Sequence, residues 1–405
     1  MVLGVDEQLA ILTAGAVDVI HEAELRKKLE RGQPLRAKLG LDPSRPDIHI
    51  GHAVVLQMLR RFQELGHVAV LIVGDFTAQV GDPSDRSSTR PALSKEEADA
   101  NAATYFEQAG RILLPENLEI RHNSEWLGAM GIADVLRLAA RATVAQMLAR
   151  DDFERRYKEG KPISIMEFLY PLLQGWDSVM VRADVELGGT DQLFNNLMGR
   201  TLQEQEGQEA QVVLTAPLLE GLDGVQKMSK SLDNYVAITE PPATQFGKLM
   251  SIPDTLTTRY FSLASGASPA EAQDFAEQAR AGTLSPVEAK RAMARRIVDA
   301  YQGEGAGEAA EAEFNRVFKS HDVPTDLPEH TLESAAAVDG QIRLANVLQQ
   351  AGLAKSNAEG RRLITQGGVR IDGEAITDPD ATYVPADLDQ VVIQVGRRRW
   401  VRIRT

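Results

Sequence analysis

The stretch AKLGLDPSRPDIHIGH, residues 37 to 52, decides the fold. Its first residues alternate apolar positions with polar or glycine positions, which is typical of a short half-buried strand. The strand is expected to end at Asp42, and apolar residues then recur at helical spacing between residues 55 and 65. The sequence therefore predicts a strand, a loop and a helix, with His49 and His52 at the helix start.

This helix start is a candidate phosphate site. A helix N-terminus presents unpaired backbone N–H groups and a partial positive charge, so it attracts anions. His49 and His52 would add side-chain donors, and Gly51, which has no Cβ, would let a bulky ligand approach the backbone. A surface turn with two capping histidines is the plainer alternative.

A second stretch, Lys227-Met-Ser-Lys-Ser231, lies in a loop rich in glycine and serine. Two lysines three residues apart can bring two ammonium charges onto a triphosphate, although a solvated lysine pair would look the same. Between the two stretches, strand and helix patterns alternate. Residues 68–73 are apolar on both faces, as in a buried strand of a parallel sheet. Ligands of such sheets bind beyond the carboxyl ends of the strands, where residues 74–77 and 81–84 fall.

The rest of the chain is assigned by periodicity and capping signals. We expect helices at residues 1–31, 94–114, 133–142 and 144–158, and strands at 118–121, 179–187 and 212–214. Beyond residue 240 we expect helices only, at 243–250, 269–281, 286–301 and 306–318, and then a linker and a tail.

A capping box at Ser164 and Glu167 predicts one further helix. Tyr170, Gln174 and Asp177 fall on one face of it, among apolar residues. A buried phenol, amide and carboxylate in line indicate a pocket for a polar molecule, because such groups need hydrogen-bond partners. The wet outer face of an amphipathic helix is the alternative.

Two aspartates occupy glycine-rich turns. Asp191, in GGTDQ, follows a predicted strand and is placed to accept ribose hydroxyls, as acidic residues do in dinucleotide folds. Asp82, between a glycine and a proline, could pair with an ammonium group, or could simply form a common Asp-Pro turn.

Composition limits the functional classes. A chain of 405 residues is long enough for two or three domains. With no cysteine and seven histidines, disulfides and thiolate-bound zinc are excluded, and we expect no metal held by the protein. No apolar run is long enough to span a bilayer, and the N-terminus lacks the pattern of a secretory signal. We therefore expect a cytoplasmic protein without a membrane partner.

The net charge of −14 argues against a nucleic-acid partner for the chain as a whole, but the charge is segregated. Residues 341–405 hold ten Lys or Arg against seven Asp or Glu, a net charge of +3, which leaves −17 for the rest. An acidic body with a basic tail is expected when a small appendage touches RNA.

The tail contains two predicted helices and an arginine-rich hairpin, with an Asp-Gly turn after residues 369–371. The stretch SNAEGRRLITQGGVRIDG resembles the alpha-L type RNA-binding module. The candidate phosphate contacts are Arg361, Arg362, Arg370, Arg397, Arg398 and Arg399, for which a merely solvated basic face is the alternative.

Five motifs, HIGH, GDPS, YxxxQxxD, GGTDQ and KMSKS, precede this tail. In this order they resemble the bacterial tyrosyl-tRNA synthetases, a family of class I aminoacyl-tRNA synthetases, across essentially the whole chain. The resemblance implies an α/β fold in which a Rossmann-type parallel-sheet catalytic domain spans residues 1–240. An all-helical anticodon-side domain at 241–322, a linker at 323–340 and a small α+β RNA-binding domain at 341–405 would follow.

The resemblance also implies roles for individual residues. Asp82, Tyr170 and Gln174 would hold the tyrosine ammonium group and Asp177 the phenol. The tyrosine-binding set is Lys38, Thr77, Asp82, Tyr170, Gln174, Asp177, Glu186 and Gln192. The ATP-binding set is Gly40, Asp42, His49, Gly51, His52, Asp191, Lys227, Met228 and Lys230, and the catalytic set is His49, His52, Lys227, Lys230 and Gln192.

One position departs from the family. Many members carry a tyrosine on the first strand that also bonds the substrate hydroxyl, whereas the aligned residue here is Lys38, in KLGLDP. We therefore expect Asp177 to be the main hydroxyl partner, with Lys38 helping it.

The function implied is ATP-dependent activation of L-tyrosine to tyrosyl-adenylate, with no covalent enzyme intermediate, followed by transfer to the 3'-terminal adenosine of tRNA(Tyr), with release of AMP and pyrophosphate. ATP would be a substrate, Mg2+ would accompany it, and the protein would be a homodimer. A tryptophanyl synthetase shares the fold and both phosphate motifs, but the GDPS turn, the polar helix face and the RNA-binding tail favour tyrosine. Another HIGH-bearing nucleotidyltransferase would not need an RNA-binding tail. A non-enzymatic RNA-binding regulator would not need the intact lysines and histidines.

Overall fold

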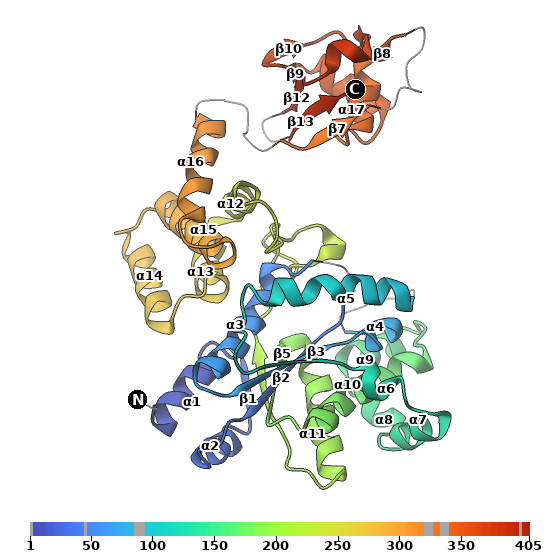
Figure 1. Cartoon of the computed structure of the whole chain (residues 1–405), viewed down its shortest axis with the longest axis vertical. Coiled ribbons are helices and arrows are strands. Elements are labelled where there is room, and N and C mark those ends of the chain that lie inside the picture. The colour runs from blue at the N-terminus through green and yellow to red at the C-terminus, as the bar shows by residue number, and fades with distance from the viewer. Residues whose placement is uncertain (1–2, 44–46, 85–93, 320–326, 333–339, 397–398) are drawn as a thin grey trace. The chain divides into compact units, whose positions relative to one another are not determined.

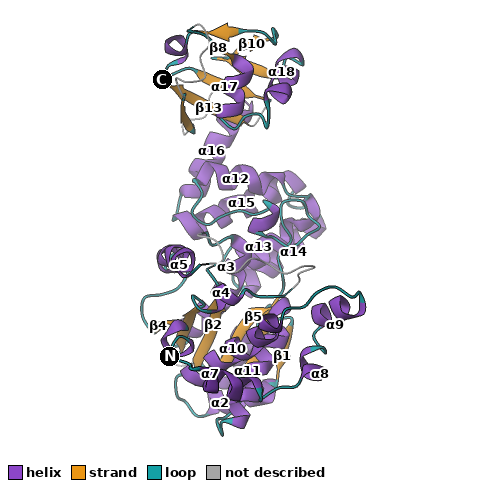
Figure 2. Ribbon diagram, turned by 90° about the vertical axis from the view of Figure 1, so that its right-hand side faces the viewer, coloured by secondary structure: helices purple, strands orange, loops and turns teal. Residues whose placement is uncertain are grey.

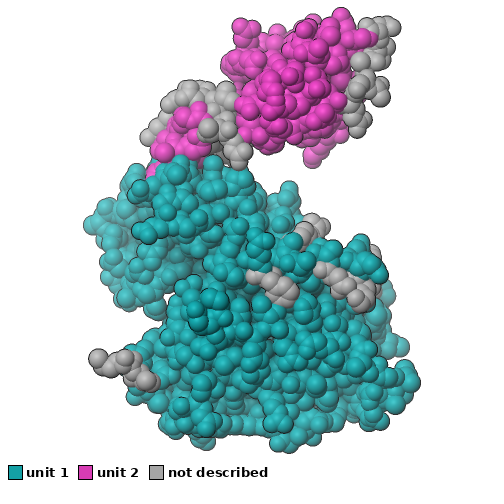
Figure 3. Space-filling model, in the orientation of Figure 1, with its two compact units in different colours: residues 1–310 teal, residues 311–405 magenta. Residues whose placement is uncertain are grey.

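The computed structural model describes residues 3–43, 47–84, 94–319, 327–332, 340–396 and 399–405. The chain forms two compact units, residues 1–310 and 311–405 (Figure 3). The division falls within helix α16 (Ala306–Lys319).

The first unit is built on a six-stranded sheet of order β1-β6-β5-β2-β3-β4. The bounds are β1 Asp18–Ile20, β2 Arg36–Leu41, β3 Val68–Val73, β4 Leu118–His122, β5 Val185–Gly189 and β6 Val212–Ala216. All neighbours pair in parallel except β1, which runs antiparallel to β6. The predicted α/β class with a parallel sheet is confirmed.

Helices cover both faces of this sheet. Val70 and Ile72 of β3 pack into one apolar cluster with residues of α10 (Ile165–Val181) and α11 (Leu193–Gln205). Because side chains alternate across a strand, their neighbours Ala69 and Leu71 point to the opposite face. There α3 (Ile50–Glu64) packs on β2, β3 and β5. Figures 1 and 2 show the sheet between these helices, which explains why β3 is apolar on both faces.

The predicted helix over residues 1–31 is wrong. The segment consists of α1 (Val5–Thr13), the edge strand β1 and α2 (Glu22–Glu30). Strand β1 is only three residues long and pairs with β6, nearly two hundred residues further along the chain. A local pattern therefore carries no sign of it.

Two other boundaries differ from the prediction. The strand expected at 179–187 begins only at Val185, because α10 continues to Val181 and ends with Arg182 in the left-handed region, at φ 51°. Short apolar runs of this kind do not distinguish a strand from a buried helix end. The helix expected at 144–158 is two helices, α8 (Val144–Met147) and α9 (Asp151–Lys158).

The remaining helices of the first part of the unit are α4 (Thr77–Val80), α5 (Lys95–Ala109), α6 (Ser124–Leu127) and α7 (Ile132–Ala139). The helical segment that follows comprises α12 (Pro242–Ser251), α13 (Thr257–Ala264), α14 (Pro269–Ala281), α15 (Pro286–Gln302) and the start of α16. Helix α13 was not predicted. It packs on α15 and on α3, so these helices belong to the same compact unit as the sheet.

The second unit has a five-stranded sheet of order β10-β9-β12-β13-β7 and a two-stranded sheet of β11 and β8. Its elements are β7 Glu329–Thr331, β8 Ile342–Arg343, α17 Leu344–Gln350, α18 Asn357–Thr365, β9 Val369–Ile371, β10 Glu374–Ile376, β11 Thr382–Tyr383, β12 Val392–Val395 and β13 Arg399–Arg404. The hairpin predicted at the Asp-Gly turn is confirmed, since β9 and β10 pair antiparallel around Asp372-Gly373. Part of the predicted linker is structured instead, because β7 pairs in parallel with β13.

None of the helices within the described ranges is long and apolar enough to cross a bilayer.

Candidate active site

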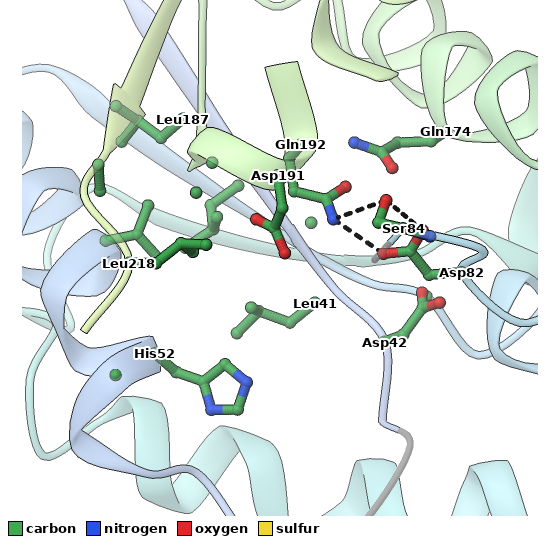
Figure 4. A pocket seen from close by; sticks show the side chains of 18 of the residues that line it. Leu41, Asp42, His52, Asp82, Ser84, Gln174, Leu187, Asp191, Gln192 and Leu218 are labelled. Carbon is green, nitrogen blue, oxygen red and sulfur yellow. Dashed lines mark hydrogen bonds between the residues drawn. The ribbon is translucent and has the colours of Figure 1, made fainter. Parts of the chain in front are cut away.

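A cleft of about 410 Å3 opens at the carboxyl ends of β2, β3, β5 and β6 (Figure 4). All nine residues predicted to bind ATP line it: Gly40, Asp42, His49, Gly51, His52, Asp191, Lys227, Met228 and Lys230. Six of the eight predicted tyrosine-binding residues also line it: Thr77, Asp82, Tyr170, Gln174, Asp177 and Gln192. Lys38 and Glu186 do not.

The two histidines lie at the N-terminus of α3, as predicted, with His49 at the N-cap position. Their rings stack with centroids 3.7 Å apart, and a Cβ at position 51 would lie 3.0 Å from the His49 ring, so any other residue there would crowd this ring. Burial and the nearby Lys230 charge lower the pKa of His49 to about 3, and burial also lowers the pKa of His52. At neutral pH both rings are therefore uncharged hydrogen-bonding groups. Within the described residues, the buried Nδ1 of His49 has no partner.

The segment after the lysine loop is joined to the histidine segment by backbone hydrogen bonds. The amide of Ile50 donates to the carbonyl of Val236 at 3.0 Å, and the amide of Ile238 donates to the carbonyl of Ile48 at 3.0 Å. This pairing holds the second motif against the first, although about 180 residues separate them along the chain.

Each lysine of the loop contacts a group in the cleft. Lys227 Nζ lies 3.0 Å from Asp191 Oδ2, and Lys230 Nζ lies 3.1 Å from the hydroxyl of Tyr105 on α5. Lys230 is buried while Lys227 is half-buried. Tyr105 was not predicted, since a lone tyrosine in a helix gives no local signal of a site.

Acidic groups concentrate at the other end of the cleft. Asp42 accepts hydrogen bonds from Thr77 Oγ1 at 2.7 Å and from the Tyr170 hydroxyl at 2.9 Å. Burial raises the pKa of Asp42 to about 7, and the negative charge of nearby Asp82 adds to the shift. Carboxylates held together in a buried site favour a cationic ligand.

Asp82 and Gln192 lie next to each other in the cleft and are joined by a hydrogen bond (Figure 4). Gln192 Nε2 donates to Asp82 Oδ2 at 2.8 Å, and Ser84 donates to Asp82 Oδ1 from its amide at 2.9 Å and its hydroxyl at 2.7 Å. The GDPS turn and the GGTDQ turn thus meet through side chains.

Asp177 is buried at the inner end, where two unpredicted residues hold it. Trp126 Nε1 donates to Asp177 Oδ1 at 2.8 Å, and Asn123 Nδ2 donates to Asp177 Oδ2 at 3.3 Å. Burial raises the pKa of Asp177 to about 7. Asn123 directly follows β4, so its position at a strand end was the signal that could have found it.

Lys38 contradicts the prediction that it helps to bind a substrate hydroxyl. Its ammonium group is fully buried and donates to Glu186 Oε1 at 2.8 Å, Ser178 Oγ at 2.8 Å and the carbonyl of Gln174 at 3.1 Å. All three of its donors are occupied. Lys38 and Glu186 form a buried ion pair behind the cleft rather than a part of its wall.

The predicted RNA contacts come from three elements of the second unit. Arg361 on α18 pairs with Asp380 at 2.6 Å, whereas Arg362 beside it is exposed. Arg370 of β9 donates to the carbonyl of Gly373, and Arg399 at the start of β13 donates to the carbonyl of Leu353. Arg397 and Arg398 lie outside the described residues.

Among the described residues, no group of three or more His, Cys, Asp or Glu side chains is arranged to hold a metal ion.

Family comparisons agree with this geometry. A family model described as tRNA synthetases class I (W and Y) matches residues 30–319, and one described as S4 domain matches residues 342–388. The family match, together with the sheet, the cleft and the HIGH and KMSKS motifs, thus defines a class I tRNA synthetase of the tryptophan and tyrosine group.

The relatives narrow this class. The tyrosine–tRNA ligase of Moorella thermoacetica is 51% identical over 405 residues, covering 99% of this chain and 96% of that protein. The tyrosine–tRNA ligase of Salinibacter ruber is 52% identical, with 99% and 97% covered. The solved tyrosyl-tRNA synthetase of Archaeoglobus fulgidus, complexed with L-tyrosine, shares the fold with a TM-score of 0.64 at 24% identity, covering 76% of this chain and 99% of that one. The chain belongs to the tyrosine–tRNA ligase family, which confirms the resemblance carried by the five motifs.

Proposed function

We propose that the protein activates L-tyrosine with ATP to form tyrosyl-adenylate. It then transfers tyrosine to the 3'-terminal adenosine of tRNA(Tyr), releasing AMP and pyrophosphate. The observation that carries the proposal is a single cleft with two chemically different ends. One end holds Asp42, Asp82 and Asp177, and the other holds two histidines and two lysines.

The acidic end fits tyrosine. Asp82, Tyr170 and Gln174 would surround the ammonium group, with Thr77 beside them. Asp42, which the sequence assigned to ATP, accepts hydrogen bonds from Thr77 and Tyr170, so we place it beside the ammonium group as well. Asp177 would accept the phenolic hydroxyl. Phenylalanine would leave this buried carboxylate without its partner, and an unpaired buried polar group is the general reason why tyrosyl enzymes reject phenylalanine. Gln192 would face the carboxylate that reacts.

The basic end fits ATP. The carboxylate of tyrosine attacks the α-phosphorus, pyrophosphate leaves, and negative charge builds up on the phosphate oxygens. His49, His52, Lys227 and Lys230 would stabilise that charge, with Gly40, Gly51 and Met228 shaping the wall. Asp191 now pairs with Lys227, so a ribose that bonds Asp191 would release this lysine towards the phosphates.

Mg2+ would enter with ATP. Magnesium is commonly bound through substrate phosphates and water rather than by a dedicated protein cage. We therefore assign it to the nucleotide and not to residues of this chain.

The tail would bind the tRNA. Its match to the S4 domain supports this role, with Arg361, Arg362, Arg370 and Arg397 to Arg399 as phosphate contacts. We propose residues 1–240 as the catalytic domain, 241–322 as the anticodon-side helical domain and 341–405 as the RNA-binding domain. Because tRNA and ATP are its substrates, we place the protein in the cytoplasm.

We also propose a homodimer. Four apolar side chains near α7 and the start of α10 are largely exposed: Ile132 at 78%, Leu136 at 63%, Val144 at 63% and Ile165 at 81%. Helices α7 and α10 contact each other, so three of these residues lie on adjoining elements. A second copy of the chain would remove this apolar surface from water.

Amino-acid-dependent exchange of labelled pyrophosphate into ATP tests the proposed activation. Exchange is expected with tyrosine and not with phenylalanine or tryptophan. Exchange with tryptophan would change the assigned substrate to tryptophan but leave the proposed class of reaction unchanged. No exchange with any of the three would favour an RNA-binding regulator instead.

A further inference from the structure

A line of buried polar side chains leads from α9 to the Gln192 amide in the cleft. It begins at Arg150, whose guanidinium forms two hydrogen bonds with Asp152, at 2.5 and 2.8 Å. The guanidinium carbon also lies 4.3 Å from the centroid of the Phe153 ring. Arg150 and Asp152 are both buried, so this arginine is fixed in place by a bidentate ion pair and an aromatic face.

Arg150 determines the orientation of the next side chain. Its Nη1 donates at 3.1 Å to Oδ1 of Asn195, which is fully buried. Arginine has donors and no acceptor, so the amide oxygen of Asn195 must face it. The amide nitrogen of Asn195 must then point the other way, and it donates to Gln192 Oε1 at 2.9 Å.

The same reasoning fixes Gln192. With Oε1 taken by Asn195, its Nε2 faces the cleft and donates to Asp82 Oδ2 at 2.8 Å. The line thus ends on a carboxylate, which accepts hydrogen bonds, and begins on a guanidinium, which donates them. Both ends impose the same direction on the two amides between them, so neither amide can turn over without losing at least two hydrogen bonds.

We propose that Arg150 and Asn195 are positioning residues for the activation of tyrosine. They hold the Gln192 amide with its N–H groups towards the reacting carboxylate of the substrate. This inference rests on the proposed function, because it assumes that a carboxylate binds beside Gln192. A glutamine turned by 180° would present its oxygen to that carboxylate and repel it.

Asn195→Asp tests the direction of the line. The new carboxylate still accepts from Arg150 but can no longer donate to Gln192, so Gln192 turns its N–H groups away from the cleft. The probes are L-tyrosine and L-tyrosinol, which lacks the carboxylate, titrated into the full-length protein by calorimetry. We expect tyrosine to bind at least about tenfold more weakly. Tyrosinol should be affected much less, because its binding changes only through the lost hydrogen bond between Gln192 and Asp82.

Further variants separate orientation from charge and from folding. Asn195→Leu, which removes the amide without adding a charge, should weaken tyrosine binding less than Asn195→Asp does. The pair Arg150→Met and Asp152→Leu removes both buried charges together and should act like Asn195→Leu. In a Gln192→Ala background, Asn195→Asp should lose most of its effect on tyrosine. Circular dichroism and thermal melting check that each variant is folded.

The outcomes are distinct. If the folded variants bound tyrosine and tyrosinol more weakly by the same factor, Arg150 and Asn195 would have a merely structural role. That result would overturn the inference. If Asn195→Asp weakened tyrosine binding just as much in the Gln192→Ala background, the added charge alone would explain the weakening. That result would also overturn the inference. A wild-type protein that binds neither ligand would overturn the proposed function itself.

Discussion

Tyrosine binding should depend on pH through Asp42. In the free protein, burial raises the pKa of this carboxyl to about 7, while hydrogen bonds from Thr77 and Tyr170 oppose the shift. A tyrosine ammonium group placed beside it would favour the ionised form, so the pKa should fall on binding. Binding then releases a proton, and the affinity should rise as the pH increases through about 7.

The magnitude follows from the pKa. At pH 6, about one molecule in ten would carry an ionised Asp42, so the Kd for tyrosine should be about tenfold higher than at pH 8. This corresponds to about 1.4 kcal/mol. Calorimetric titrations at pH 6, 7 and 8 give the affinities. Repeating them in two buffers with different ionisation enthalpies gives the number of protons released.

Asp177 needs a control, because burial raises its pKa to about 7 as well. The ligand 3-(4-hydroxyphenyl)propionate keeps the phenol and carboxylate but lacks the ammonium group, so it reports on Asp177 without Asp42. Asp42→Asn should remove most of the pH dependence for tyrosine. The reasoning fails if the affinity is constant from pH 6 to 8, if the dependence persists in Asp42→Asn, or if the propionate shows all of it.

Three further predictions follow from the site and its surroundings. Lys230→Ala should slow adenylate formation by at least about tenfold with little change in tyrosine affinity, because the lysine acts on the transition state. An unchanged rate of pyrophosphate exchange would show that Lys230 takes no part in the reaction. Lys38→Met should destabilise the protein by about 3–5 kcal/mol in urea unfolding, since it leaves the buried Glu186 carboxylate without its counter-charge, and adding Glu186→Gln should recover most of the loss. If that double variant were stable but attached phenylalanine to tRNA, Lys38 would contribute to recognition of the tyrosine hydroxyl after all. If the protein is the homodimer proposed above, Leu136→Asp should convert it to a monomer in light scattering, and a dimer that survived would place the interface elsewhere.

Local sequence patterns predicted the elements whose signals lie within a few residues. The strand and helix around His49, the capping box at Ser164 and the hairpin at Asp372 all have the predicted form. Backbone propensity, capping and turn chemistry act between near neighbours, so the sequence carries them directly. The short strands β1 and β7 were missed because their partners β6 and β13 are distant in the chain.

The sequence by itself determined the fold class, the family and most of the motif residues that line the cleft, because each motif keeps its chemistry within a short stretch. Only the tertiary structure decided how polar side chains pair. Lys38 bonds Glu186, 148 residues away, instead of facing the cleft, and Arg150 sets the direction of the Gln192 amide through Asn195. A buried polar group must find a partner or lose free energy, and the partner is whichever donor or acceptor the packing of remote segments brings within reach.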